Sequence, residues 1–92
     1  MVLMREVSYS NQFAESVADI VSEKLRMRLD GVLASIEALP GIGSPNVQKS
    51  LRDDYGPDIR KLPFPPFVIV YRYDSIRDLF EFVALPHGRN IA

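Results

Sequence analysis

The sequence of 92 residues contains no cysteine and only one histidine. Without cysteine there are no disulfide bonds, no thiolate nucleophile and no cysteine-ligated zinc or iron–sulfur centre. The segment Gly41-Ile42-Gly43 is too short for a dinucleotide-binding loop. Asp53 and Asp54, with a single histidine elsewhere, do not make a transition-metal site. We therefore expect neither a cofactor nor a metal.

The chain also lacks long apolar runs and a surplus of positive charge. No apolar run reaches the ~18 residues that cross a bilayer, and the first residues do not resemble a signal peptide, so we expect a cytoplasmic protein without a membrane partner. The 11 Lys and Arg residues and 12 Asp and Glu residues give a formal net charge of −1, whereas dedicated nucleic-acid binders usually carry excess cations. Any anion site must come from local clustering. With 47% hydrophobic residues, we expect residues 1–92 to form one globular domain.

The first half of the chain predicts one strand followed by helices. Residues 2–7 form a short apolar-rich run that is typical of a strand. Ser10 or Asn11 can cap the helix that follows, because either side chain can accept a hydrogen bond from a free backbone N–H. Beyond this helical region, residues 46–54 could form one short helical turn.

A long apolar stripe with helical spacing extends from Phe13 to Leu39. A single helix over residues 11–39 would be ~43 Å long, which exceeds the diameter of a small domain. We therefore predict a helical hairpin with its turn near residues 19–23, where Ser22 could cap the second helix. A bend at Asp30-Gly31 is the alternative.

The last third of the chain predicts adjacent antiparallel strands. Residues 67–73 are rich in β-branched and aromatic side chains, residues 74–77 suit a hairpin turn, and the partner strand runs from residue 78 or 79 to 85. A short strand over residues 59–62 precedes them, and Pro63, Pro65 and Pro66 belong to a connection or an edge because proline cannot donate to a ladder. The element order predicts an α+β domain in which the helical hairpin packs on an antiparallel sheet of three to four strands.

Cationic side chains gather in this C-terminal part of the sequence: Arg60, Lys61, Arg72, Arg77, His87 and Arg89. Strand alternation puts Phe67, Ile69, Tyr71 and Tyr73 on one face and Val68, Val70 and Arg72 on the other. If the helices cover one face, Arg60, Arg72 and residues 87–89 could share the open one. Guanidinium groups bind phosphate or carboxylate bidentately, and a histidine can transfer a proton near neutral pH.

Simpler structural roles compete with this hypothesis. Arg60, Lys61 and Arg77 could be solvated surface charges, and Arg72 could pair with Glu81 on the neighbouring strand. His87 could do no more than hold a turn after Pro86. Tyr71 and Tyr73 suit the core or a sheet face better than catalysis.

The chain resembles the RelE/ParE superfamily of toxins from bacterial toxin–antitoxin modules. The resemblance covers the whole element order, and its specific part is the pattern R-x-L-P followed by Y-R and a closing H-G-R, present here as Arg60 to Pro63, Tyr71-Arg72 and His87 to Arg89. The ParE-like branch is favoured by the closing motif. The slightly acidic net charge disfavours the hypothesis of a ribosome-directed toxin, because such members are usually basic.

The resemblance implies a growth-arresting toxin that is neutralised by a cognate antitoxin, whose disordered tail folds over the helices and sheet. ParE-like members inhibit DNA gyrase without being enzymes themselves, whereas RelE-like members cut mRNA on the ribosome. If the chain is RelE-like, the resemblance implies four catalytic candidates by position: Arg60, Arg72, His87 and Arg89. For a ParE-like or a RelE-like protein, the whole cationic set is the candidate group for binding the target. A dimer or a toxin–antitoxin hetero-oligomer would fit the family, and an inactive scaffold that only binds a partner is the third alternative.

Overall fold

The structure is a computed structural model that describes residues 6–88. Its elements are β1 (Glu6–Tyr9), α1 (Asn11–Ala18), α2 (Glu23–Ala38), the short 3₁₀ turn η1 (Pro40–Ile42), α3 (Lys49–Tyr55), β2 (Arg60–Phe64), β3 (Phe67–Asp74) and β4 (Leu79–Ala84). Of the first predicted strand, residues 2–5 lie outside the described part, and the described part of β1 continues to Tyr9. No helix within residues 6–88 has both the length and the apolar character that a bilayer crossing requires.

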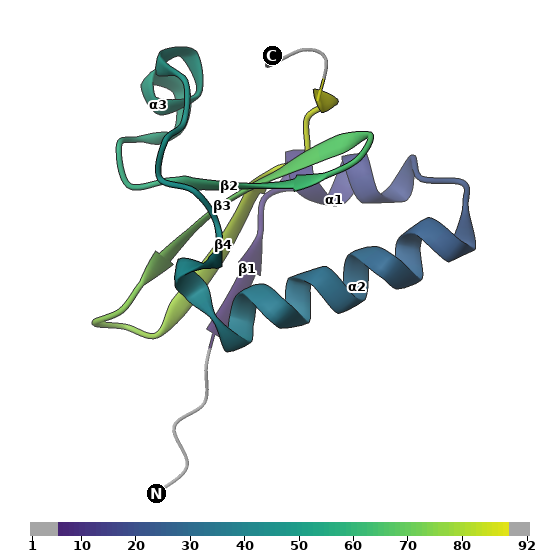
Figure 1. Ribbon diagram of the computed structural model, residues 1–92, viewed down its shortest axis with the longest axis horizontal. Coiled ribbons are helices and arrows are strands. Elements are labelled where there is room, and N and C mark those ends of the chain that lie inside the picture. The colour runs from purple at the N-terminus through teal and green to yellow at the C-terminus, as the bar shows by residue number, and fades with distance from the viewer. Residues whose placement is uncertain (1–5, 89–92) are drawn as a thin grey trace, which may run out of the picture.

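The α+β fold class is confirmed, with a four-stranded sheet in the order β1-β4-β3-β2 (Figure 1). The β2–β3 and β3–β4 pairs are antiparallel, as the C-terminal sequence predicts. The sheet as a whole is mixed, because β1 runs parallel to β4. A parallel pair needs a long crossover, and here the whole chain from α1 to β3 provides it.

The helical hairpin breaks where the sequence places its turn. The Ser22 side-chain oxygen accepts a hydrogen bond from Leu25 N at 3.2 Å and caps α2, and Ser10 caps α1 in the same way through Phe13 N at 2.9 Å. The Ser10 hydroxyl also donates to the Val83 carbonyl at 2.6 Å, which ties the start of α1 to β4. The alternative bend at Asp30-Gly31 does not form, since α2 continues through both residues.

Two apolar clusters sandwich the sheet. The larger one joins α1 and α2 to the face that carries Ile69 and Tyr71, and the smaller one joins α3 and the segment before it to the face that carries Val70. The alternation predicted for β3 is therefore confirmed. The expectation of an open second face is wrong, because Val47 and Leu51 pack over it.

Tyr71 fixes the connection after α2 to the sheet. Its ring is completely buried, and its hydroxyl donates to the Pro40 carbonyl at 2.7 Å and accepts from Gly43 N at 2.9 Å. A Cβ at Gly43 would lie 2.5 Å from the Tyr71 hydroxyl oxygen, closer than nonbonded atoms tolerate. Glycine at this position thus permits the close approach of backbone and phenol.

We expect Tyr71→Phe to lower the free energy of unfolding by about 1–3 kcal/mol, because it leaves the part-buried Pro40 carbonyl and the buried Gly43 N–H without their partner. Urea denaturation of the purified variant measures the effect. The matched control is Tyr55→Phe, which removes an exposed hydrogen bond to Gln12 and should cost clearly less. Equal losses for the two variants would contradict the anchoring role of Tyr71.

Candidate functional site

The C-terminal cations do not meet on one face. Arg60 pairs in register with Tyr71, so its side chain lies on the face that α1 and α2 cover, and Arg72 lies on the opposite face. His87 pairs with Phe67, which lies four residues before Tyr71 on β3. Because Arg60 pairs with Tyr71, the positions of Arg60 and His87 are roughly 13 Å apart along the strand direction. The hypothesis that Arg60 and Arg72 share an open face is therefore wrong. Arg89 lies outside the described residues.

Most of these cations have partners within the fold. Arg60 Nη1 donates to the Gly43 carbonyl at 2.6 Å. Arg72 Nη2 donates to the Tyr55 carbonyl at 2.7 Å, and its guanidinium lies 3.3 Å from Asp58 and 3.8 Å from Glu81. The predicted pairing of Arg72 with Glu81 is confirmed. Arg72 thus holds the end of α3 against the sheet.

The remaining members of the predicted set occupy three separate places. Lys61 pairs in register with Val70 and so lies on the α3 side, while its backbone bonds to Ser44. Arg77, on the exposed hairpin turn, lies 3.8 Å from Asp74. The His87 ring packs edge-on against Phe67 with 5.4 Å between centroids. Its Nδ1 is buried and has no hydrogen-bond partner among residues 6–88.

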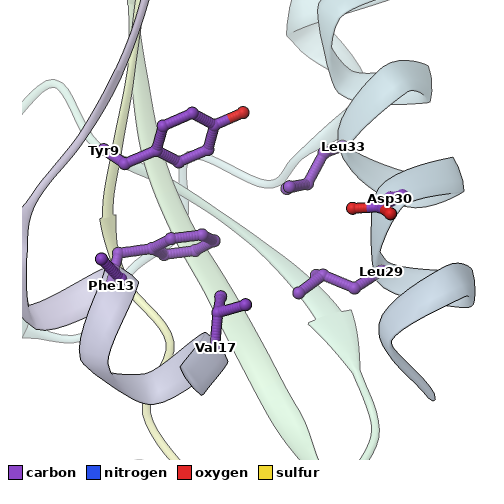
Figure 2. A pocket seen from close by; sticks show the side chains of 7 residues that line it. Tyr9, Phe13, Val17, Leu29, Asp30 and Leu33 are labelled. Carbon is purple, nitrogen blue, oxygen red and sulfur yellow. The ribbon is translucent and has the colours of Figure 1, made fainter. Parts of the chain in front are cut away.

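An apolar cleft of about 320 Å³ lies elsewhere, between the two helices and β1 (Figure 2). Its lining comes from one residue of β1, three of α1 and three of α2: Tyr9, Phe13, Ala14, Val17, Leu29, Asp30 and Leu33. Its volume is near the lower end of the about 300–1,000 Å³ typical of ligand sites. The cleft is therefore large enough to hold only a small group, such as a few side chains.

Tyr9 forms one wall of the cleft. Its ring stacks on Phe82 with 5.4 Å between centroids and also contacts Phe13 at 5.7 Å. Half of its surface is nevertheless exposed, and in Figure 2 its hydroxyl points across the cleft towards α2. Burial, and then the negative charges of Glu37 and Asp30, raise the pKa of the Tyr9 phenol above its ordinary value.

The sheet edge beside this cleft is open, whereas the opposite edge is closed. At the outer edge of β2, the backbone N–H and C=O groups of Lys61 bond to the backbone of Ser44. Pro63, two residues further along the same edge, has no N–H to donate. Beside β1, Glu6 N donates to the Asp78 carbonyl just before β4, and Ser10 N donates to the Phe82 carbonyl in β4. Because backbone groups alternate in direction along a strand, the N–H and C=O groups of Val7 and Tyr9 point outwards. No residue among 6–88 pairs with this outer edge.

The sequence alone did not indicate Tyr9 or Asp30 as site residues. Phe13, Val17, Leu29 and Leu33 were already expected on the apolar stripe of the helices, but the stripe alone does not show that it is incompletely covered. The available signal was Asp30, a charged residue that directly follows Leu29 and so borders that stripe. Within the described residues, no group of three or more potential metal ligands gathers.

Residues 7–92 match the model of the ParE toxin of the type II toxin–antitoxin system parDE. The chain belongs to the ParE toxin family. No curated protein matches it significantly.

Two solved structures resemble the fold of this ParE-family chain. A chain of the intact E. coli RelBE toxin–antitoxin complex superposes with a TM-score of 0.65 at 11% identity, covering 91% of this chain and 96% of that one. The isolated E. coli RelE toxin gives a TM-score of 0.69 at 10% identity, covering 92% of this chain and 85% of that one. At such identities the likeness concerns the fold, and it confirms the RelE/ParE-like architecture expected from the sequence.

We expect Asp30→Asn to lower the pKa of Tyr9, because removal of a nearby negative charge favours the phenolate. Ultraviolet titration near 295 nm, with Tyr9→Phe used to assign the Tyr9 transition, measures it. Glu15→Gln removes a charge from the exposed side of α1 and should leave the Tyr9 titration unchanged. An unchanged Tyr9 pKa in Asp30→Asn would show that the carboxylate does not act on the cleft.

We expect Arg72→Met to lower the free energy of unfolding by about 1–3 kcal/mol, because it removes the bond to the Tyr55 carbonyl and both carboxylate contacts. Arg77→Ala, which removes a long contact on the surface, should change stability by less than about 0.5 kcal/mol. Urea denaturation compares the two. A stable Arg72→Met variant would mean that Arg72 is not needed to hold α3.

Proposed function

We propose that this ParE-family toxin arrests growth by binding a protein target such as DNA gyrase. The observation that carries the proposal is the separation of the candidate catalytic cations. RNA cleavage needs a cation that stabilises the phosphate charge and an acid–base group, both at one reacting centre. Among the described residues, Arg72 is on the α3 side of the sheet, and the Arg60 and His87 positions are far apart on the other side.

The charge of the chain supports the same proposal. A formal net charge of −1 gives little electrostatic attraction to ribosomal RNA. A protein target does not require this attraction, because protein interfaces depend chiefly on buried apolar and aromatic anchors. The part of the six predicted cationic residues in target binding stays a prediction, which alanine substitution at each position would test: Arg60, Lys61, Arg72, Arg77, His87 and Arg89.

We further propose that the cognate antitoxin neutralises the toxin by covering the cleft between α1, α2 and β1. An apolar cleft beside an open strand edge offers both pockets for side chains and unpaired backbone groups. The E. coli RelBE complex, which has a related fold, is a toxin–antitoxin assembly. Antitoxin binding here would bury Tyr9, the exposed aromatic of the cleft.

We expect induced expression of the chain to arrest bacterial growth, and purified protein to inhibit DNA supercoiling by gyrase while leaving mRNA intact in a translating extract. The Arg60→Ala and His87→Ala variants serve as controls, because loss of a catalytic group would abolish mRNA cleavage. Ribosome-dependent mRNA cleavage without an effect on supercoiling would overturn the proposal in favour of a RelE-like endoribonuclease. Absence of growth arrest would leave only a partner-binding scaffold.

A further inference from the structure

Asp30 is the charged group of an otherwise apolar cleft. It lies on α2 between Leu29 and Leu33, on the wall of the cleft that stands across from Tyr9 (Figure 2). No described cation pairs with it: Arg26, one helical turn earlier, donates instead to the Ala18 carbonyl at 3.3 Å. In apolar sites, a few polar groups of this kind fix the orientation of whatever binds.

Covering the cleft would remove water from this carboxylate. An apolar side chain placed over it would not replace the lost hydrogen bonds, and an acidic side chain would add repulsion. A cation from the partner would satisfy it. Arginine suits the place best, because a guanidinium can pair with the carboxylate while its planar face stacks on the half-exposed ring of Tyr9.

We propose that the partner segment which fills the cleft is an apolar stretch that carries one arginine or lysine, and that this cation pairs with Asp30. Asp30 is then the residue that selects among partners, since the apolar lining accepts most hydrophobic side chains while the carboxylate rejects an acidic one. The inference rests on the proposed function, in which the partner is the antitoxin. It adds the chemistry by which the antitoxin segment is recognised.

Selection of short peptides tests this charge preference directly. A displayed library of random 12-residue peptides is selected on the immobilised chain, and binders that also bind an Ala14→Trp variant are removed. Ala14 is an exposed residue of the cleft lining, so tryptophan there blocks the cleft with little strain on the core. Circular dichroism and urea denaturation confirm that each variant is folded.

The expected result is a set of cleft-specific peptides that combine bulky apolar residues with an arginine or lysine at a fixed spacing. Asp30→Lys should weaken binding of such a peptide by more than about tenfold and should shift a new selection towards Asp and Glu. The matched control Glu15→Lys makes the same charge change on α1 outside the cleft lining and should weaken binding less than about twofold.

Three outcomes would overturn the inference. Selected peptides could lack a charge preference, Glu15→Lys could weaken binding as much as Asp30→Lys, or no peptide could depend on the cleft. Gel filtration adds a further outcome, because a wild-type dimer that Ala14→Trp dissociates would identify a second copy of the chain as the occupant. Failure of the growth and supercoiling assays would overturn the proposed function, while the peptide selection reports on Asp30 independently.

Discussion

Strand β3 lies between β4 and β2, and two adjacent residues on it anchor the segments that cover the two faces of the sheet. Tyr71 points to the α1–α2 side and holds Pro40 and Gly43 through its hydroxyl. Arg72 points to the other side and holds the end of α3 through Tyr55 and Asp58. The two-residue side-chain period of a strand is the constraint that separates these roles.

The same constraint determines what the C-terminal cations contact. Because Arg60 and Arg72 contact carbonyl and carboxylate groups of the fold, the cations that look like a site in the sequence act mainly as structural links. The accessible hollow lies near the other edge of the sheet, between α1, α2 and β1 (Figure 2). Its character is apolar with one carboxylate, which favours recognition of a protein segment over catalysis on an anion.

The features that could be predicted from the sequence are those that depend on interactions between residues close together in the chain. Ser10 and Ser22 as caps, the break between α1 and α2, and the alternation along β3 all follow from neighbouring residues. The face on which Arg60 lies could not be predicted in this way, because it depends on the register between β2 and β3, and a slip of one residue would move Arg60 to the opposite face.

Long-range packing accounts for the other differences. The covering of the second face by α3, and the parallel pairing of β1 with β4, join segments that are distant in the chain. The cleft could not be predicted for a related reason. The sequence shows that Phe13 and Leu33 belong to an apolar stripe, but it does not show whether other parts of the same chain cover that stripe completely.

The most direct test is a crystal structure of the chain bound to the protein encoded beside its gene. We expect apolar partner side chains between Tyr9, Val17 and Leu33, with an arginine or lysine at Asp30. A partner that binds over Arg72 and α3 and leaves the cleft uncovered would contradict it.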